Sequence, residues 1–154
     1  MAVSEHRSEV VEDLNRLMAE EAEAFLRYFQ MRFRLRGKGR GTAEKFFEGA
    51  LKETLEHADA IARQIRSLGH VPTLHIHLSL GGGPMRPDEA LAEALDVEQQ
   101  ALDAYKDFLP RVAGDPVLED FIRTQIAAET EHVQEILDVV HAGRPLRLVA
   151  KPES

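Results

Sequence analysis

Four long stretches of the sequence place apolar residues at intervals of three, four or seven, which is the spacing of one face of an α-helix. Short, long and short connections separate these stretches. Helices that each bury one apolar face pack into a bundle, and a long connection is needed where two consecutive helices run parallel. We therefore predict an all-α, single-domain four-helix bundle over residues 1–154, with one long crossover between the second and third helices. The predicted helices cover about 5–36, 43–68, 87–112 and 116–142.

Glycine, proline and capping residues indicate where these helices begin and end. Three glycines interrupt residues 36–42, and we expect the Thr42 side chain to cap the second helix. Pro87 suits the first position of the third helix, and Asp115 followed by Pro116 suits the start of the fourth. The segment 144–154 is short and contains prolines, so we expect no further helix there.

The composition excludes several classes of protein. There is no cysteine, which rules out disulfides and thiolate metal sites and favours the cytoplasm. No apolar run approaches the roughly 18 residues of a membrane span, and the first residues are too polar for a signal peptide, so we expect no membrane association. A net charge of −8 argues against DNA as a partner.

Charged and imidazole side chains stand in the middle of the apolar stripes. Burying them is costly unless they pair with one another or hold a metal ion. No lysine lies at the matching level, and Arg32 is about three helical turns away from Glu21. A buried salt-bridge network remains the alternative, but oxygen and imidazole ligands without thiolate suit iron, manganese or zinc. The residues concerned are Glu21, His57, Glu98, Glu129 and His132.

The two halves of the chain repeat this pattern. Glu21 is followed seven residues later by Tyr28, and Glu98 is followed seven residues later by Tyr105. Two helical hairpins related by an approximate twofold axis would bring the polar side chains to one level of the bundle. Two carboxylate-rich halves favour a pair of divalent ions.

At these residues the sequence resembles a bacterioferritin-type or Dps-like member of the ferritin-like superfamily, over about residues 8–142. The resemblance implies that Glu21 and Glu98 are terminal ligands of two iron ions. Glu129 would bridge the ions, and Tyr28 would be a hydrogen-bonding and redox-active residue beside them. His57 and His132 would each bind one ion. The matching motifs are Leu14-Asn15-x-Leu17 with Glu21 and Tyr28-Phe29, His57-Ala58-Asp59, and Glu129-Thr130-Glu131-His132.

The sequence departs from the family pattern at two positions of the second helix. Thr54 stands where Glu-x-x-His requires a second bridging glutamate, and Glu53 is the neighbouring carboxylate that could replace it. Leu55 stands where bacterioferritins carry the methionine that binds haem, so we expect no haem. The family's additional C-terminal helix is not expected either, which argues against a 24-subunit cage and favours a homo-oligomer that is a dimer or a smaller cage of, for example, 12 subunits.

Three functions are compatible with these patterns. The first is Fe(II) binding and oxidation by O2 or H2O2, a ferroxidase activity that serves iron storage or detoxification. The second is a metal-poor helical scaffold with a degenerate site, and the third is a two-metal oxidase that acts on an organic substrate in a pocket beside the ions. His75 and His77, two residues apart in the crossover, form either a second metal site or a polar rim.

Overall fold

The computed structural model describes residues 2–142 and contains four α-helices, as the sequence predicts. The observed helix boundaries differ from the predicted ones by a few residues. The expectation that residues 144–154 form no helix lies outside the described residues. The helices are α1 (Ala2–Arg34), α2 (Arg40–Ser67), α3 (Pro87–Phe108) and α4 (Pro116–Ala142), and a 3₁₀-helix η1 (Leu109–Val112) follows α3.

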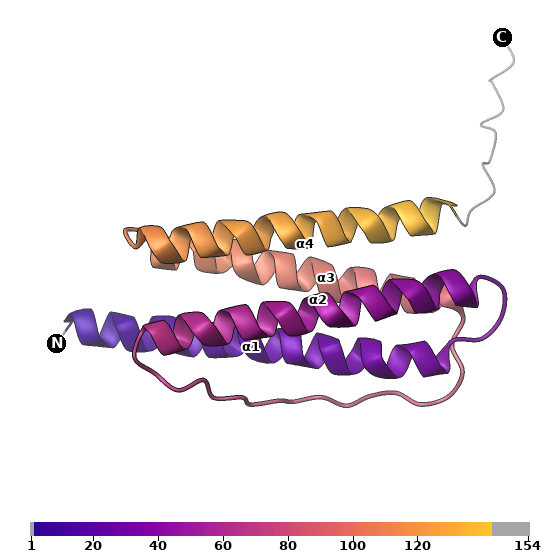
Figure 1. The fold of residues 1–154 in the computed structure, drawn as a ribbon, viewed down its shortest axis with the longest axis horizontal. Helices are drawn as coiled ribbons and strands as arrows, with labels where there is room; N and C mark the ends of the chain where they lie inside the picture. Colours follow the sequence, from indigo (N-terminus) through magenta and orange to yellow (C-terminus); the bar gives the residue numbers. More distant parts are fainter. Residues whose placement is uncertain (1, 143–154) are drawn as a thin grey trace, which may run out of the picture.

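The helices form two antiparallel hairpins that pack against each other (Figure 1). One hairpin is α1–α2, and the other is α3–α4. Between them, residues 68–86 run along α1 from one end of the bundle to the other (Figure 1). Helices α2 and α3 therefore run parallel, and the predicted long crossover is confirmed. None of the helices described over residues 2–142 is both long enough and apolar enough to cross a membrane.

Two predicted helix boundaries are wrong for local reasons. Gly39 adopts a left-handed conformation with φ of 86°, and α2 begins directly after it at Arg40 without a side-chain cap. Thr42 consequently lies inside the helix instead of capping it. The last turn of the third helix is a 3₁₀-helix that contains Pro110, because proline has no backbone N–H with which to continue the α-helical pattern. In contrast, the predicted cap at Asp115 is confirmed, since its Oδ1 accepts the N–H of Leu118 at 3.1 Å.

Hydrogen bonds fix the crossover to α1 and to the residue that follows α1. The backbone N–H of Thr73 donates to Asn15 Oδ1 at 2.9 Å, and that of His77 donates to Glu23 Oε1 at 3.0 Å. At the far end, a parallel bridge joins Leu35 to Met85, just before α3 begins. These contacts set the level at which α3 starts relative to α1, and so determine which residues of the two helices face each other.

The apolar core consists of two clusters, one toward each end of the bundle. The buried polar side chains Glu21, Glu98 and Glu129 belong to neither cluster and interrupt the core between them. Tyr105 is part of the first cluster and Tyr28 is part of the second. The first also includes Leu14, Ile61 and Ile122, and the second includes Phe47, Ala94 and Ile136.

Candidate metal centre

The structure brings together the five predicted ligands, which come from all four helices. Glu21 lies on α1, His57 on α2, Glu98 on α3, and Glu129 and His132 on α4. The three carboxylates are buried, with no more than 3% of any residue exposed, and the imidazoles are about one-eighth exposed. The apolar stripes that bury the helices therefore carry these groups into the interior.

Two groups of three side chains each hold ligand atoms within 4.8 Å of one another. One consists of Glu21, His57 and Glu129, and the other of Glu98, Glu129 and His132. Glu129 belongs to both groups. This is the arrangement that the family resemblance implies for two ions with one bridging carboxylate, although the ligand roles themselves stay predictions.

Both imidazoles turn the Nδ1 atom toward the carboxylates. His57 Nδ1 lies 3.1 Å from Glu129 Oε1 and 3.5 Å from Glu21 Oε1. His132 Nδ1 lies 3.4 Å from both Glu98 Oε2 and Glu129 Oε2. The two rings are stacked, with centroids 5.4 Å apart and planes inclined by 14°. The Nδ1 atoms are therefore the nitrogen donors that face the centre.

The two tyrosines connect the hairpins crosswise. The hydroxyl of Tyr28 on α1 donates to Glu98 on α3 at 2.5 Å, and the hydroxyl of Tyr105 on α3 donates to Glu21 on α1 at 2.7 Å. Burial, together with the facing carboxylate, raises the pKa of each tyrosine well above its ordinary value, so both remain neutral donors. The sequence prediction included Tyr28 but missed Tyr105, although the repeated glutamate-to-tyrosine spacing of seven pointed to both.

The carboxylates keep both imidazoles protonated in the absence of a metal. Burial alone lowers the pKa of an imidazole, but the contacts with carboxylates outweigh burial here. Glu129 and Glu21 raise the pKa of His57 to about 10. Glu129 and Glu98 raise the pKa of His132 to about 11. At neutral pH the two imidazolium ions therefore offset part of the buried negative charge.

The two outer carboxylates differ in acidity. Burial raises the pKa of Glu21, and this effect outweighs the hydrogen bonds from His57 and Tyr105. Burial also acts to raise the pKa of Glu98, but hydrogen bonds that include those from His132 and Tyr28 outweigh it, and that pKa is lowered. The ionised form of Glu98 is thus better stabilised than the ionised form of Glu21.

The composition of the centre fits divalent metal ions. Within residues 2–142, the buried Glu129 Oε2 has no hydrogen-bond partner, an arrangement that is costly unless another group compensates the charge. Three buried carboxylates, with the partly exposed Glu53 as a fourth, contact only two imidazoles, so the carboxyl groups outnumber the protein's own cations at the centre. Oxygen donors with imidazole nitrogen suit iron, manganese and zinc. The residues present therefore fit such an ion.

Thr54 and Glu53, the two residues at the departure from the family pattern, behave differently in the structure. Thr54 is buried, and its hydroxyl donates to the backbone carbonyl of Leu51 at 3.0 Å. Glu53 turns instead toward α4, where its Oε2 lies 2.6 Å from His132 Nε2. Glu53 thus reaches the centre from outside the two three-residue groups.

A cleft of about 380 Å³ leads to the carboxylates between α1 and α3. Thr54, Glu21 and Glu98 all contribute to its wall. A glutamate at the position of Thr54 would place a larger side chain in this wall. The remaining polar lining is mainly acidic, and its one cation, Arg27, lies 3.5 Å from Glu93. That lining includes Glu20, Glu23, Arg27, Glu93, Asp96 and Gln100.

The comparison with protein families decides the classification. The family described as "Ferritin-like domain" matches residues 11–144. The chain belongs to the ferritin-like family. No curated protein sequence matches it significantly.

Solved structures support the ferritin-like fold. A ferritin-like, diiron-carboxylate protein from Bacillus anthracis is 25% identical, with coverage of 88% of this chain and 97% of that chain and a TM-score of 0.79. The bacterioferritin-related protein of Bacteroides fragilis, described as a dodecameric thioferritin, is 23% identical, with coverage of 88% and 86% and a TM-score of 0.79. A Dps protein from Bacillus brevis is 17% identical, with coverage of 87% and 96% and a TM-score of 0.79.

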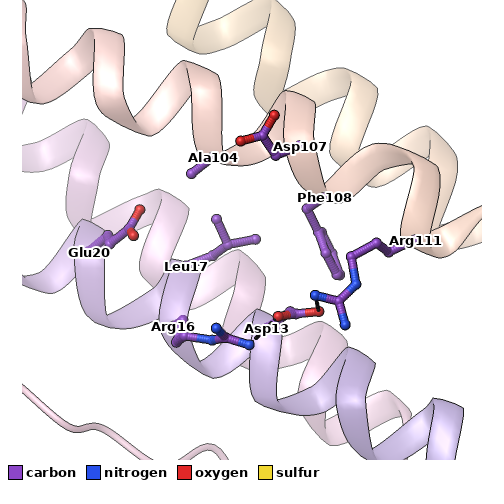
Figure 2. Close-up of a pocket in the computed structure, with 8 residues that line it drawn as sticks. All are labelled: Asp13, Arg16, Leu17, Glu20, Ala104, Asp107, Phe108 and Arg111. Atoms are coloured by element: carbon purple, nitrogen blue, oxygen red, sulfur yellow. Dashed lines mark hydrogen bonds and ion pairs between the residues drawn. The ribbon is translucent and has the colours of Figure 1, made fainter.

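A second, smaller pocket of about 170 Å³ lies between α1 and the segment formed by α3 and η1 (Figure 2). Its main feature is the buried Asp13, which forms ion pairs with Arg16 and with Arg111, the latter at 2.7 Å. As Figure 2 shows, Arg111 reaches across from η1 to Asp13. The lining within residues 2–142 includes none of the predicted ligands, so this pocket is a structural contact between the hairpins of this ferritin-like chain.

His75 and His77 lie apart from the centre, on the exposed crossover. Neither belongs to the two groups with ligand spacing found within residues 2–142. The backbone of His77 is instead used to hold the crossover against Glu23. The polar-rim interpretation agrees with this placement.

The raised pKa values of the imidazoles predict how the stability of the metal-free ferritin-like protein changes with pH. Between the ordinary pKa of 6.5 and about 10, the folded protein retains protons on His57 and His132 that the unfolded chain releases. The free energy of unfolding is therefore expected to fall as the pH rises through this range. Urea unfolding in the presence of a chelator measures this slope. The double variant His57→Gln/His132→Gln should show a flatter dependence, and stability that rises with pH in the unaltered protein would contradict the prediction.

Proposed function

We propose that this ferritin-like protein binds two Fe(II) ions within the bundle and oxidises them with O2 or H2O2. The observation that carries the proposal is the pair of three-residue groups that share Glu129, a buried carboxylate whose Oε2 accepts no hydrogen bond within residues 2–142. In the proposed arrangement, Glu21 and His57 hold one ion, Glu98 and His132 hold the other, and Glu129 contacts both. Manganese and zinc share these ligand preferences and are alternative occupants.

Binding requires proton release, because each imidazole must offer a lone pair at Nδ1. His57 and His132, both protonated without metal, each lose one proton when an ion enters. Carboxylate oxygens stabilise Fe(III) relative to Fe(II), which favours the loss of one electron from each ion. The two electrons and two protons convert O2 to H2O2, or convert H2O2 to two molecules of water. Iron is therefore the substrate of the proposed reaction.

The cleft between α1 and α3 bears on the choice between substrates. A two-metal oxidase of organic molecules needs a pocket beside the ions. The cleft lies at such a place, because Glu21 and Glu98 form part of its wall. Its acidic lining, however, attracts cations and disfavours neutral or anionic organic molecules. The acidic lining therefore favours iron as the substrate and as the species that passes through the cleft. The absence of cysteine favours the cytoplasm as the location of this chain.

The shared carboxylate provides the first test. Glu129→Gln preserves the shape of the side chain but removes its charge, and it is expected to abolish retention of the two ions. The measurement is metal analysis after loading with Fe(II) under controlled oxygen. Glu131→Gln, on the exposed side of the same helix, is the matched control and should load as the unaltered protein does. If the unaltered protein retains no iron, manganese or zinc, the scaffold interpretation is correct instead.

Tyr28 provides the second test. Because the family resemblance implies a redox role for Tyr28, whose hydroxyl donates to Glu98, we expect Tyr28→Phe to leave the number of bound ions unchanged and to slow Fe(II) oxidation by about tenfold or more. The change is followed by the absorbance of the ferric product under single-turnover conditions. Tyr105→Phe removes the equivalent hydrogen bond to Glu21 and serves as the comparison. A redox role for Tyr28 predicts that only its own variant is slow, and equal slowing in both variants would reject that role.

We further propose that the chain forms a homo-oligomer. Phe29 and Phe33 on α1 are 48% and 63% exposed, and their rings pack edge to face with centroids 5.7 Å apart. Exposed aromatic pairs of this kind are typical of protein interfaces. The structurally similar Bacteroides fragilis protein is described as dodecameric, which supports a homo-oligomer for this chain. Storage of the ferric product requires that the subunits close into a shell.

The oligomer proposal predicts a single species larger than a monomer at micromolar concentration in sedimentation velocity experiments. Phe33→Ser should weaken the assembly, because it replaces an exposed aromatic ring with a small polar side chain. Val117→Ser, at an exposed position on α4, is the control and should not change the sedimentation coefficient. A monomer in the unaltered protein would contradict the proposal and exclude a storage shell.

A further inference from the structure

Glu53 makes a contact that distinguishes one imidazole from the other. Its Oε2 lies 2.6 Å from Nε2 of His132, while Nδ1 of the same ring faces Glu98 and Glu129 at 3.4 Å. The ring is therefore held from both sides. Glu53 lies on α2 and its side chain is 43% exposed, so it contacts the outer edge of the ring and not the interior of the centre.

The other imidazole has no such support. In the part of the chain that the structure describes, all the carboxylate contacts of His57 involve Nδ1. The sequence explains the difference. Glu53 lies four residues before His57, and the equivalent residue four positions before His132 is Ala128. Helix α2 therefore carries a carboxylate, Glu53, that contacts the imidazole of α4. At the equivalent position α4 carries Ala128, whose methyl group cannot make such a contact.

We propose that Glu53 is a positioning residue that makes the two metal positions unequal. The inference rests on the proposed two-metal function. Through its ion-pair contact with Nε2 of His132, Glu53 keeps the proton of the ring on Nε2, which fixes the orientation that presents Nδ1 to an ion and increases the basicity of Nδ1. The position formed by Glu98, Glu129 and His132 is then filled first and holds its ion more tightly. The position formed with Glu21 and His57 is filled second and exchanges more readily.

The test uses zinc, which cannot be oxidised and scatters anomalously. Crystals of the full-length, metal-free protein are soaked with one equivalent of Zn(II) per chain, and the anomalous peak heights at the two positions are compared. The expected result is a dominant peak beside His132. In Glu53→Gln the two peaks become comparable, and calorimetric titration with Zn(II) shows the tighter of two binding steps weakened by about 10- to 100-fold.

Two further variants complete the design. Glu56→Gln removes the same charge from an exposed neighbour on α2 and should retain the dominant peak beside His132. Ala128→Glu supplies the missing carboxylate on α4 and should strengthen the peak beside His57, which keeps the proposal testable if Glu53→Gln fails to fold.

Each of the remaining outcomes overturns a definite statement. Equal peaks in the unaltered protein overturn the inequality while leaving the two-metal function intact. A bond from a Glu53 oxygen to an ion shows that Glu53 is a ligand and overturns the positioning role. Loss of the dominant peak in Glu56→Gln shows that general charge, and not the contact with His132, determines the order of filling. No zinc at either position overturns the proposed function itself.

Discussion

The burial of three carboxylates at the middle of the bundle is the constraint on which the rest of the structure depends. Such groups are stable in an apolar interior only when hydrogen bonds and opposite charges surround them. Glu21, Glu98 and Glu129 receive this compensation from two tyrosines and two imidazoles. Because these partners lie on different helices, all four helices must meet at one level. The crossover contacts with α1 determine that level, and the two apolar clusters stabilise the bundle on either side of it.

The polar layer also connects the two hairpins. Tyr28 and Tyr105 each belong to an apolar cluster but donate to a carboxylate on the other hairpin. The same side chain therefore contributes apolar packing and polar compensation, which couples the core to the site. This approximate twofold symmetry is broken at the bridging position, where α4 supplies Glu129 and α2 supplies Thr54. It is broken again outside the two three-residue groups, where Glu53 faces Nε2 of His132, while the carboxylate contacts of His57 within residues 2–142 all involve Nδ1.

The architecture and the inner residues of the centre were accessible from the sequence because both depend on helical periodicity. An apolar stripe fixes which way a side chain points, and so five candidate ligands could be placed at one interior level. Periodicity does not fix how far a side chain reaches across to a neighbouring helix. The contact between Glu53 and His132, on different hairpins, depends on the packing of α2 against α4 and was not predicted in that form. Thr42 was misassigned as a cap because the left-handed Gly39 already turns the chain into α2.

Thr54 stands where the family pattern has a bridging glutamate. With Glu53 nearby, this difference changes the position of the negative charge more than its total amount. Glu21, Glu53, Glu98 and Glu129 are four carboxyl groups, a number that would match the charge of two divalent ions once both imidazoles are neutral. One of these groups, Glu53, lies beyond the outer edge of His132 and not between the ions. If two divalent ions bind as proposed, Glu129 would be the one carboxylate between them that reduces their mutual repulsion in a medium of low dielectric. Repulsion of this kind disfavours the second ion relative to the first. The replacement at Thr54 and the contact of Glu53 with His132 therefore act in the same direction, toward two positions of unequal affinity.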